Sequence, residues 1–190
     1  MTLPRRLPVR RLAAGAELWR IHARARGPVW FGPAAGAPPQ NRFDAPGGEF
    51  RVCYLGQSLE AAFVETMVRG RARLMVALTE LRARSATAVP LARELRLAQL
   101  HSEGLVRLSL SAAAPHADTY ADCQRLALSL WSHSDQVDGI EYRSRWDDSL
   151  LCVALFERAA DALAPAGPSL RLDATSILRP VLRRYGIGVV

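Results

Sequence analysis

The chain has 190 residues, of which 49% are hydrophobic and 23% charged, values typical of one globular domain large enough to bury its own core. Its formal net charge is +7, and all 25 basic residues are arginines scattered without a long basic run, which disfavours nucleic-acid binding and fits a small anionic ligand. No apolar run is long enough to span a membrane, and the basic start lacks the apolar segment of a signal peptide, so we expect a cytoplasmic protein with no membrane contact.

The first part of the chain predicts an arm, a strand and a folded-back connection. We expect residues 1–14 to form a flexible arm and residues 15–190 a single domain. Residues 17–22 alternate as a strand does and place Arg20 and His22 on one face. An arginine on such a strand can belong to a site, although edge strands carry charges too. The Gly/Pro-rich connection 27–40 contains Trp-Phe, which indicates that it packs against the domain, and it matches no standard phosphate loop.

Residues 41–69 have the most informative pattern in the chain. Pro46-Gly47-Gly48 predicts a turn, and residues 51–56 then alternate as a half-buried strand. Ser58 is a good N-cap for a helix over residues 59–70, with Gly70 as its stop. A loop, a turn, a strand and a helix therefore follow one another within thirty residues.

Glu65 lies in the middle of this predicted helix and has two interpretations. Its neighbours Ala61 and Ala62 are small, so the carboxylate could face a cleft. Alternatively it is a solvated glutamate paired with Arg69 one turn later, which is the more common situation for a helical carboxylate.

The remaining elements follow from periodicity and turn signals. Ser144 falls in a predicted hairpin, where a serine most often bonds to backbone. Residues 95–110 are ambiguous, since they fit a strand and turn followed by either a short helix or a second strand. The other predictions are strands over 73–81 and 87–91, a helix over 118–134 capped by Asp118, hairpin strands over 140–145 and 149–156, a linker over 159–168, a helix over 175–185 and a strand over 186–190.

Cysteines and histidines give no sign of a disulfide framework or a metal site. Cys53, Cys123 and Cys152 are far apart and lie in apolar segments, which predicts reduced core cysteines. The four histidines show no ligand spacing, and we expect no metal.

Several short motifs, in this order, resemble the RES domain family, which is named for an arginine, a glutamate and a serine. The resemblance covers roughly residues 17–158, and no single motif in it is specific by itself. The matching stretches are LWRIH at 18–22, FGP at 31–33, RFD at 42–44, PGG at 46–48, VCYL at 52–55, SLEAAFVE at 58–65 and DGIEYRSR at 138–145.

The resemblance implies a fold, an activity and partners. The fold would be α+β and ADP-ribosyltransferase-like, of the diphtheria-toxin type: a compact domain with two small packed sheets and flanking helices around an NAD⁺ cleft. The activity would be cleavage of the nicotinamide–ribose bond of NAD⁺, as a glycohydrolase, a phosphorylase or an ADP-ribosyltransferase, and NAD⁺ would be a substrate. The protein would be the toxin of a bacterial toxin–antitoxin pair, covered by a helical Xre-type antitoxin, and it could form oligomers.

The resemblance also assigns roles to five residues. It makes Glu65, Arg20 and Ser144 catalytic, and Arg20, Arg42, Tyr54 and Ser144 ligand-binding. The two arginines would hold the pyrophosphate, and Tyr54 would pack on nicotinamide or its ribose. Glu65 would bond the ribose and stabilise positive charge at the anomeric carbon, while Ser144 would support the ribose or nicotinamide.

Three points stay open at this stage. Toxin members of the family often have asparagine where this chain has Asp44, and a carboxylate there would either weaken anion binding or orient Arg42. The nucleophile is water, phosphate or a protein side chain. The alternative function is a catalytically weak RES-fold module that acts by binding a protein partner.

Overall fold

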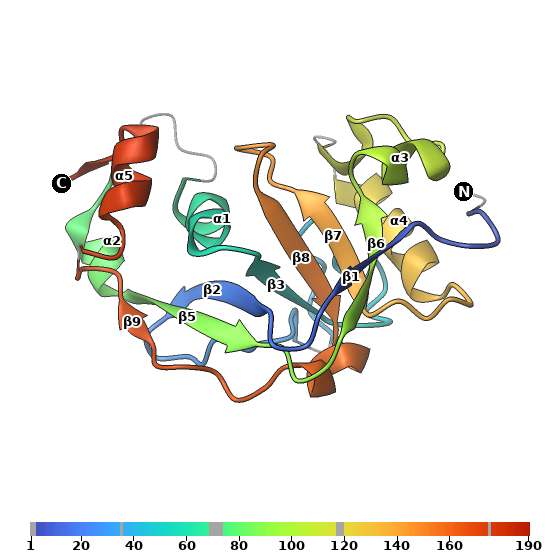
Figure 1. Cartoon of the computed structure of the whole chain (residues 1–190), viewed down its shortest axis with the longest axis horizontal. Coiled ribbons are helices and arrows are strands. Elements are labelled where there is room, and N and C mark those ends of the chain that lie inside the picture. The colour runs from blue at the N-terminus through green and yellow to red at the C-terminus, as the bar shows by residue number, and fades with distance from the viewer. Residues whose placement is uncertain (1–2, 35, 69–73, 117–119, 175) are drawn as a thin grey trace.

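A mixed sheet runs through the molecule, in the strand order β1-β6-β7-β8-β3-β2-β5-β9 (Figure 1). The computed structural model describes residues 3–34, 36–68, 74–116, 120–174 and 176–190, and within them this sheet has eight strands. A separate pair, β10-β4, is parallel. The strands are β1 Val9–Leu12, β2 Glu17–Ala23, β3 Val52–Gly56, β4 Met75–Val76, β5 Arg84–Pro90, β6 Leu95–Leu100, β7 Gly139–Arg143, β8 Leu151–Phe156, β9 Leu170–Arg171 and β10 Gly188–Val189.

The helices are short apart from α4, which covers one face of the sheet behind β6 and β7 (Figure 1). The helix α1 continues directly into a π-helical turn, η1. The helical segments are α1 Leu59–Phe63, η1 Val64–Val68, α2 Leu78–Arg82, α3 Glu103–Arg107, η2 Ala114–His116, α4 Tyr120–Trp131, η3 Glu157–Ala162 and α5 Arg179–Tyr185. Among the described residues, no helix is both long enough and apolar enough to cross a bilayer.

The large sheet consists of two parts that diverge at β2 and β3. The strands β1, β6, β7, β8 and β3 form one part, and β2, β5 and β9 form the other. In the described residues, Trp19 opposite Gly56 is the one register pair between them. The resemblance predicted two small packed sheets, and this is corrected to one mixed sheet with a fork, together with the small β10-β4 pair. The α+β class itself is confirmed.

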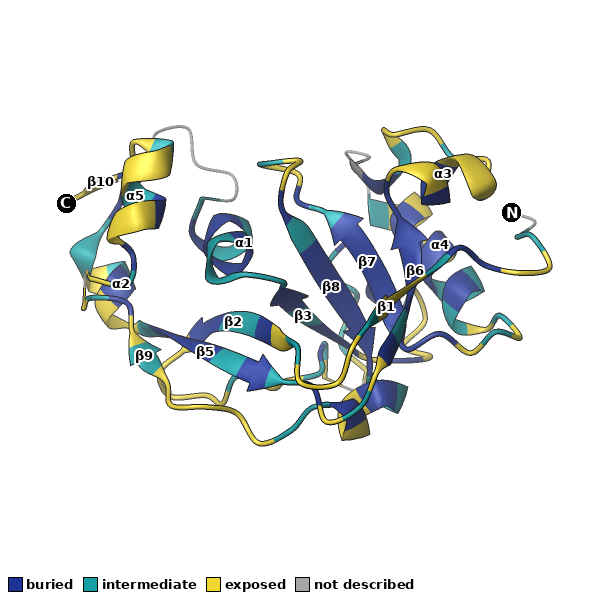
Figure 2. Cartoon of the chain, viewed as in Figure 1, coloured by how far each residue is buried: buried dark blue, intermediate teal, exposed yellow. Residues whose placement is uncertain are grey.

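The segment α1–η1 lies in the fork and packs against both parts of the sheet (Figure 2). Ala61 and Val64 belong to the core under α4, whereas Phe63 and Met67 belong to the core beside α5. Gly56 allows this helix to begin close to β3, because a Cβ there would lie 2.5 Å from the backbone nitrogen of Ala62. Glu65 and Thr66 of η1 therefore face the space between the diverging strands.

Most of the predicted elements are confirmed. The first part of the linker predicted over 159–168 is instead the end of η3, and two further predictions are wrong. The predicted strand over 73–81 is instead β4 followed by α2, because a short apolar run does not distinguish a strand from a buried helix. Leu81, fully buried, anchors that helix. The ambiguous segment 95–110 is the strand β6 followed by α3. Gly70 and Asp118, the expected stop and cap, lie outside the described residues.

The expected flexible arm is the second error. Within residues 3–14, the strand β1 pairs antiparallel with β6. Leu7 is 4% exposed, and its N–H donates to Asp135 at 2.8 Å. Backbone pairing thus ties this segment to the sheet, which composition alone did not reveal.

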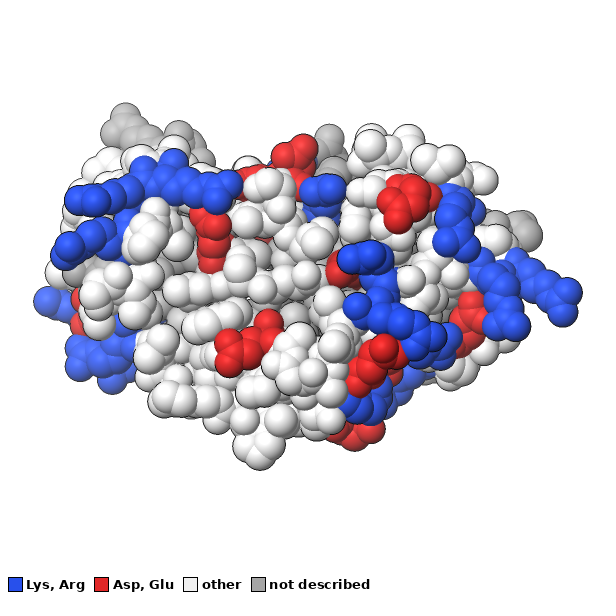
Figure 3. Space-filling view, viewed as in Figure 1, with Lys and Arg blue, Asp and Glu red and all other residues white. Residues whose placement is uncertain are grey.

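Charge is unevenly distributed on the face that contains the fork. Arginines gather toward the α5 end and the β1 end of this face, and most of the surface between them is uncharged (Figure 3). Cys53, Cys123 and Cys152 are buried free thiols, as predicted.

Candidate active site

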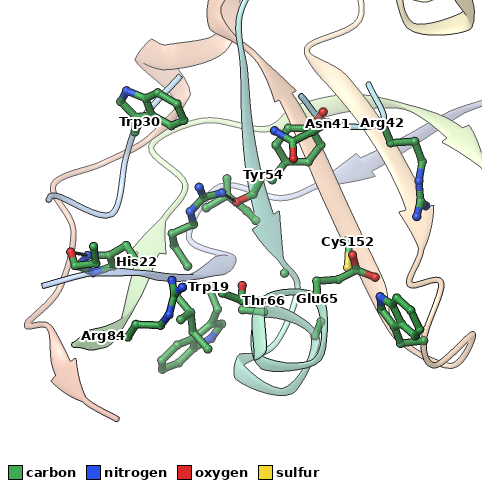
Figure 4. Close-up of a pocket in the computed structure, with 18 of the residues that line it drawn as sticks. Trp19, His22, Trp30, Asn41, Arg42, Tyr54, Glu65, Thr66, Arg84 and Cys152 are labelled. Carbon is green, nitrogen blue, oxygen red and sulfur yellow. Dashed lines mark hydrogen bonds between the residues drawn. The ribbon is translucent and has the colours of Figure 1, made fainter. Parts of the chain in front are cut away.

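A cavity of about 390 Å³ opens in the fork between β2 and β3. Arg20, Arg42, Tyr54 and Glu65, four of the five residues predicted from the sequence, line it together. The elements that supply them are β2, the loop after residue 40, β3 and η1. The resemblance placed all five residues around one cleft; four of them share this cavity, and Ser144 is not part of its lining (Figure 4).

Glu65 is placed by a helix that changes its pitch. Ser58 caps α1, accepting from the Ala61 N–H at 3.0 Å, as predicted. The next turn is π-helical, a rare form that occurs frequently at functional sites. One carboxylate oxygen of Glu65, Oε1, accepts from the Ser144 hydroxyl at 2.6 Å and from the Arg145 N–H at 3.1 Å. Arg69, the partner of Glu65 in the alternative interpretation, lies outside the described residues.

Ser144 lies behind Glu65 rather than in the cavity wall. It is 1% exposed, and it directly follows β7. Its hydroxyl donates to Glu65 and accepts from the Trp146 N–H at 3.1 Å. Its backbone N–H closes the turn by donating to the Leu150 carbonyl at 2.9 Å. In this geometry Ser144 orients the carboxylate, whereas the resemblance implied that Ser144 supports the ribose or nicotinamide.

Arg42 is a buried cation that lacks hydrogen-bond partners within the described residues. Its side chain is 8% exposed, and within the described residues its Nε and Nη1 have no hydrogen-bond partner. The guanidinium lies 5.9 Å from the ring centroid of Phe43 and 5.7 Å from that of Tyr142. Aromatic faces attract a cation but leave its N–H groups unpaired. Since buried unpaired donors are costly, the arrangement suits an anion that enters from the cavity.

The Asp44 carboxylate is occupied by the loop and by Tyr54. Its Oδ1 accepts from the Tyr54 hydroxyl at 2.9 Å, and its Oδ2 accepts from the backbone N–H groups of Gln40 and Asn41 at 2.9 and 2.7 Å. Asp44 therefore orders the loop that carries Arg42, without a hydrogen bond or ion pair to the Arg42 side chain in the described structure. Burial and the neighbouring Asp44 raise the pKa of Tyr54, so the phenol stays neutral.

Arg20 reaches across the fork from β2. One of its terminal nitrogens donates to the backbone carbonyl of Tyr54 on β3. This contact spans the two parts of the sheet near the point where they diverge. It also leaves the remaining N–H groups of Arg20 beside the cavity that Arg20 lines.

The sequence assigned no site role to several other lining residues. They include aromatic rings at both ends, further arginines and a buried thiol: Trp30, Tyr142, Trp146, Arg26, Arg84, Arg145 and Cys152. Burial, followed by the nearby Glu65 carboxylate, raises the pKa of the Cys152 thiol, which keeps it protonated and unreactive. Arg84 comes to the cavity through strand pairing, for which the sequence carries no local signal.

Comparisons with known proteins agree with the resemblance. The family model of the RES domain matches residues 17–175. A relative described as "Probable toxin y4kH", from Sinorhizobium fredii (strain NBRC 101917 / NGR234), is 27% identical over 126 residues, 66% of this chain and 98% of the relative. A chain in the crystal structure of the M. tuberculosis MbcT–MbcA toxin–antitoxin complex superposes with a TM-score of 0.64. That match covers 90% of this chain and 92% of the other, at 16% identity, and so concerns the fold.

Proposed function

The chain belongs to the RES domain family, and from this premise we propose that it cleaves the nicotinamide–ribose bond of NAD⁺. The observation that carries the proposal is the arrangement of Glu65 and Arg42 in one cavity. Glu65 is held through one oxygen, Oε1, and within the described residues its Oε2 accepts no hydrogen bond. Arg42 lines the same cavity, and its buried Nε and Nη1 have no hydrogen-bond partner among the described residues. In a nicotinamide ribose phosphate, the Glu65 carboxylate would match the ribose and the Arg42 guanidinium would match the phosphate.

The negative charge of Glu65 suits cleavage of the nicotinamide–ribose C–N bond. As the C–N bond lengthens, its electron pair leaves with nicotinamide, which departs as a neutral molecule, and the anomeric carbon becomes cationic. The free oxygen of Glu65 would stabilise that cation more than it stabilises the ground state. Ser144 and the Arg145 N–H would hold the carboxylate in place before the reaction, so that little reorganisation is required.

The other residues would bind and orient the substrate. Arg20 and Arg42 would bond the pyrophosphate, for which guanidinium groups are well suited. The Tyr54 ring would lie against nicotinamide or its ribose, because its hydroxyl is already used by Asp44. Water, phosphate or a protein side chain then adds to the anomeric carbon and completes glycohydrolase, phosphorylase or ADP-ribosyltransferase chemistry.

We further propose that the fold is of the ADP-ribosyltransferase kind and that the protein acts as a toxin with an antitoxin partner. The forked sheet around a central cleft supports the first point. Relatives described as a probable toxin and as part of a toxin–antitoxin complex support the second. An antitoxin of the Xre type would cover the cleft. If induction of this protein in bacteria arrests growth, and Glu65→Ala abolishes the arrest, the toxin role stands; growth unaffected by the native protein would refute it.

The enzymatic proposal is tested by nicotinamide release. Purified protein is incubated with NAD⁺, with and without inorganic phosphate, beside Glu65→Ala, and products are separated by chromatography. We expect release by the native protein and a loss of about 10²–10³-fold or more in the variant. Dependence on phosphate would identify phosphorolysis, and release without phosphate would identify hydrolysis. Absence of release in both buffers, and of transfer to bacterial proteins, would leave the partner-binding module as the better description.

A further inference from the structure

The cavity contains more positive charge than a pyrophosphate requires. Among the residues that the structure describes, five arginines line it, against one carboxylate, Glu65. The arginines are Arg20, Arg26, Arg42, Arg84 and Arg145. NAD⁺ carries two phosphates and one pyridinium cation, so Arg20 and Arg42 already match its pyrophosphate. The pyrophosphate therefore does not account for the three other arginines in the cavity lining.

Two of these arginines are unpaired in a chain whose surface arginines commonly pair. Outside the cavity, Arg93 bonds Asp161 at 2.9 Å and Arg171 bonds Asp173 at 2.6 Å. Arg26 and Arg84, in contrast, make no side-chain hydrogen bond or ion pair with any residue that the structure describes. Guanidinium groups that line a cavity without acidic partners favour an anionic ligand.

Arg26 and Arg84 flank the same turn at the end of β2. Arg84 lies opposite Ala23 in the β2–β5 register. Ala23 begins a turn that Arg26 closes, its N–H donating to the Ala23 carbonyl at 2.9 Å. His22 holds that turn, because its Nδ1 donates to the Arg26 carbonyl at 2.7 Å while its Nε2 contacts the Thr87 hydroxyl at 2.9 Å. Strand pairing and a braced turn thus bring two cations to one end of the cavity.

This end is distant from the carboxylate and carries an aromatic face. Figure 4 shows His22, Arg84 and Trp30 on one side of the cavity, and Glu65, Cys152 and Arg42 on the other. Trp30 lines the cavity and is 45% exposed. A half-exposed indole offers a surface on which a purine base can stack. With nicotinamide ribose at Glu65, a dinucleotide that extends through the cavity would place its adenosine near Trp30, Arg26 and Arg84.

We propose that Arg26 and Arg84 bind a third phosphate, carried on the adenosine ribose, and that the preferred substrate class is the phosphorylated dinucleotide NADP⁺. This inference rests on the proposed function. Arginine is the residue that accommodates a 2′-phosphate in other dinucleotide sites, because its fork matches the phosphate oxygens. Inorganic phosphate has the same chemistry and is the other possible source of the anion.

The test compares nicotinamide release from NADP⁺ and from NAD⁺. We expect kcat/KM to be at least about tenfold higher for NADP⁺, since one charge-assisted contact is sufficient for that factor. Arg84→Met keeps the length of the side chain and removes the charge, and it should bring the ratio close to one. Arg82→Met, two residues earlier at the end of α2 and outside the cavity lining, should leave the ratio unchanged. A native ratio near one would overturn the proposal.

A binding measurement separates this inference from the chemistry. Calorimetry with adenosine 2′,5′-bisphosphate and AMP should show about tenfold tighter binding of the bisphosphate, lost in Arg84→Met. Such binding without nicotinamide release would refute the proposed function and keep the phosphate site. Equal binding of the two nucleotides, with phosphate stimulation of NAD⁺ cleavage that Arg84→Met abolishes, would assign the site to free phosphate and overturn the proposal.

Discussion

Two glutamates lie in or beside strand β7, and they differ in how many of their carboxylate oxygens are hydrogen-bonded. Glu141, within β7, is 1% exposed and has both oxygens occupied. Its Oε1 accepts from Gln57 at 2.5 Å, and its Oε2 lies 2.8 Å from His101 Nε2 and 3.6 Å from Arg10 Nε. Glu65, held by the residues that follow β7, has one oxygen bonded by the protein and the other open to the cavity.

The difference indicates which carboxylate is structural. A buried charge with every acceptor paired contributes to the fold, and removing it leaves its partners unsatisfied. A carboxylate held at one oxygen beside a cavity keeps the other for a ligand. Alternation along β7 places Glu141 on the sheet face opposite Tyr142, which lines the cavity. Glu141 therefore lies on the far side of the sheet from the cavity that Glu65 lines. Substitutions should therefore affect activity at residues that line the cavity, as Glu65 does, and stability at fully paired residues such as Glu141.

Arg42 should behave as a ligand-binding residue. Arg42→Met removes a buried guanidinium whose Nε and Nη1 have no partner among the described residues, so the free energy of unfolding should stay equal or rise. The KM for the dinucleotide should rise about 100-fold, because two charged hydrogen bonds to phosphate are lost. Urea denaturation and steady-state kinetics measure the two effects. Arg51→Met, which removes an exposed ion pair with Glu157, is the control, and unfolding of Arg42→Met would contradict the assignment.

Glu141 should show the reverse behaviour. Glu141→Gln leaves His101 and Arg10 without their carboxylate, and we expect a loss of about 1–3 kcal/mol in the free energy of unfolding. Nicotinamide release per folded molecule should be unchanged. Urea denaturation followed by activity assays at low temperature tests this. A stable but inactive variant would show that Glu141 belongs to the site.

Ser144 should affect the rate through Glu65. Ser144→Ala removes the hydroxyl that orients the carboxylate, and kcat should fall about tenfold with little change in KM. Ser144→Thr retains the hydroxyl and should restore most of the rate, which a purely structural role would not predict. Ser132→Ala, on the surface at the end of α4, is the matched control. A change in KM alone would show that Ser144 binds substrate instead.

Buried phenols should make the fold sensitive to alkali. Burial raises the pKa of Tyr54 and Tyr142 above the ordinary value of about 10. Above that pH the unfolded chain loses the phenol protons while the folded chain keeps them, so the stability present below about pH 10 is lost as the pH rises. Tyr142→Phe should weaken the pH dependence of urea denaturation between pH 9 and 11. An unchanged slope would contradict the assignment.

The sequence predicted which residues lie together better than it predicted their contacts. Motif order identified Arg20, Arg42, Tyr54 and Glu65, and the structure brings them into one cavity. The position of Ser144 behind Glu65 depends on how the β7–β8 turn closes.

Other features could not be predicted because they depend on long-range pairing. The place of Arg84 in the cavity depends on the β2–β5 register, and the pairing of residues 9–12 depends on β6. The strand predicted over 73–81 failed for a different reason, since a short apolar run fits both a strand and a buried helix.

The most direct test of the central claim is nicotinamide release by Glu65→Gln, which keeps the shape of the side chain and removes its charge. Glu60→Gln, on the same helical segment but outside the cavity lining and paired with Arg184, is the control. We predict that Glu65→Gln keeps the native urea midpoint and loses about 10²–10³-fold or more of kcat, while Glu60→Gln keeps the rate. A Glu65→Gln protein that cleaves the dinucleotide at the native rate, or that fails to fold, would contradict the account.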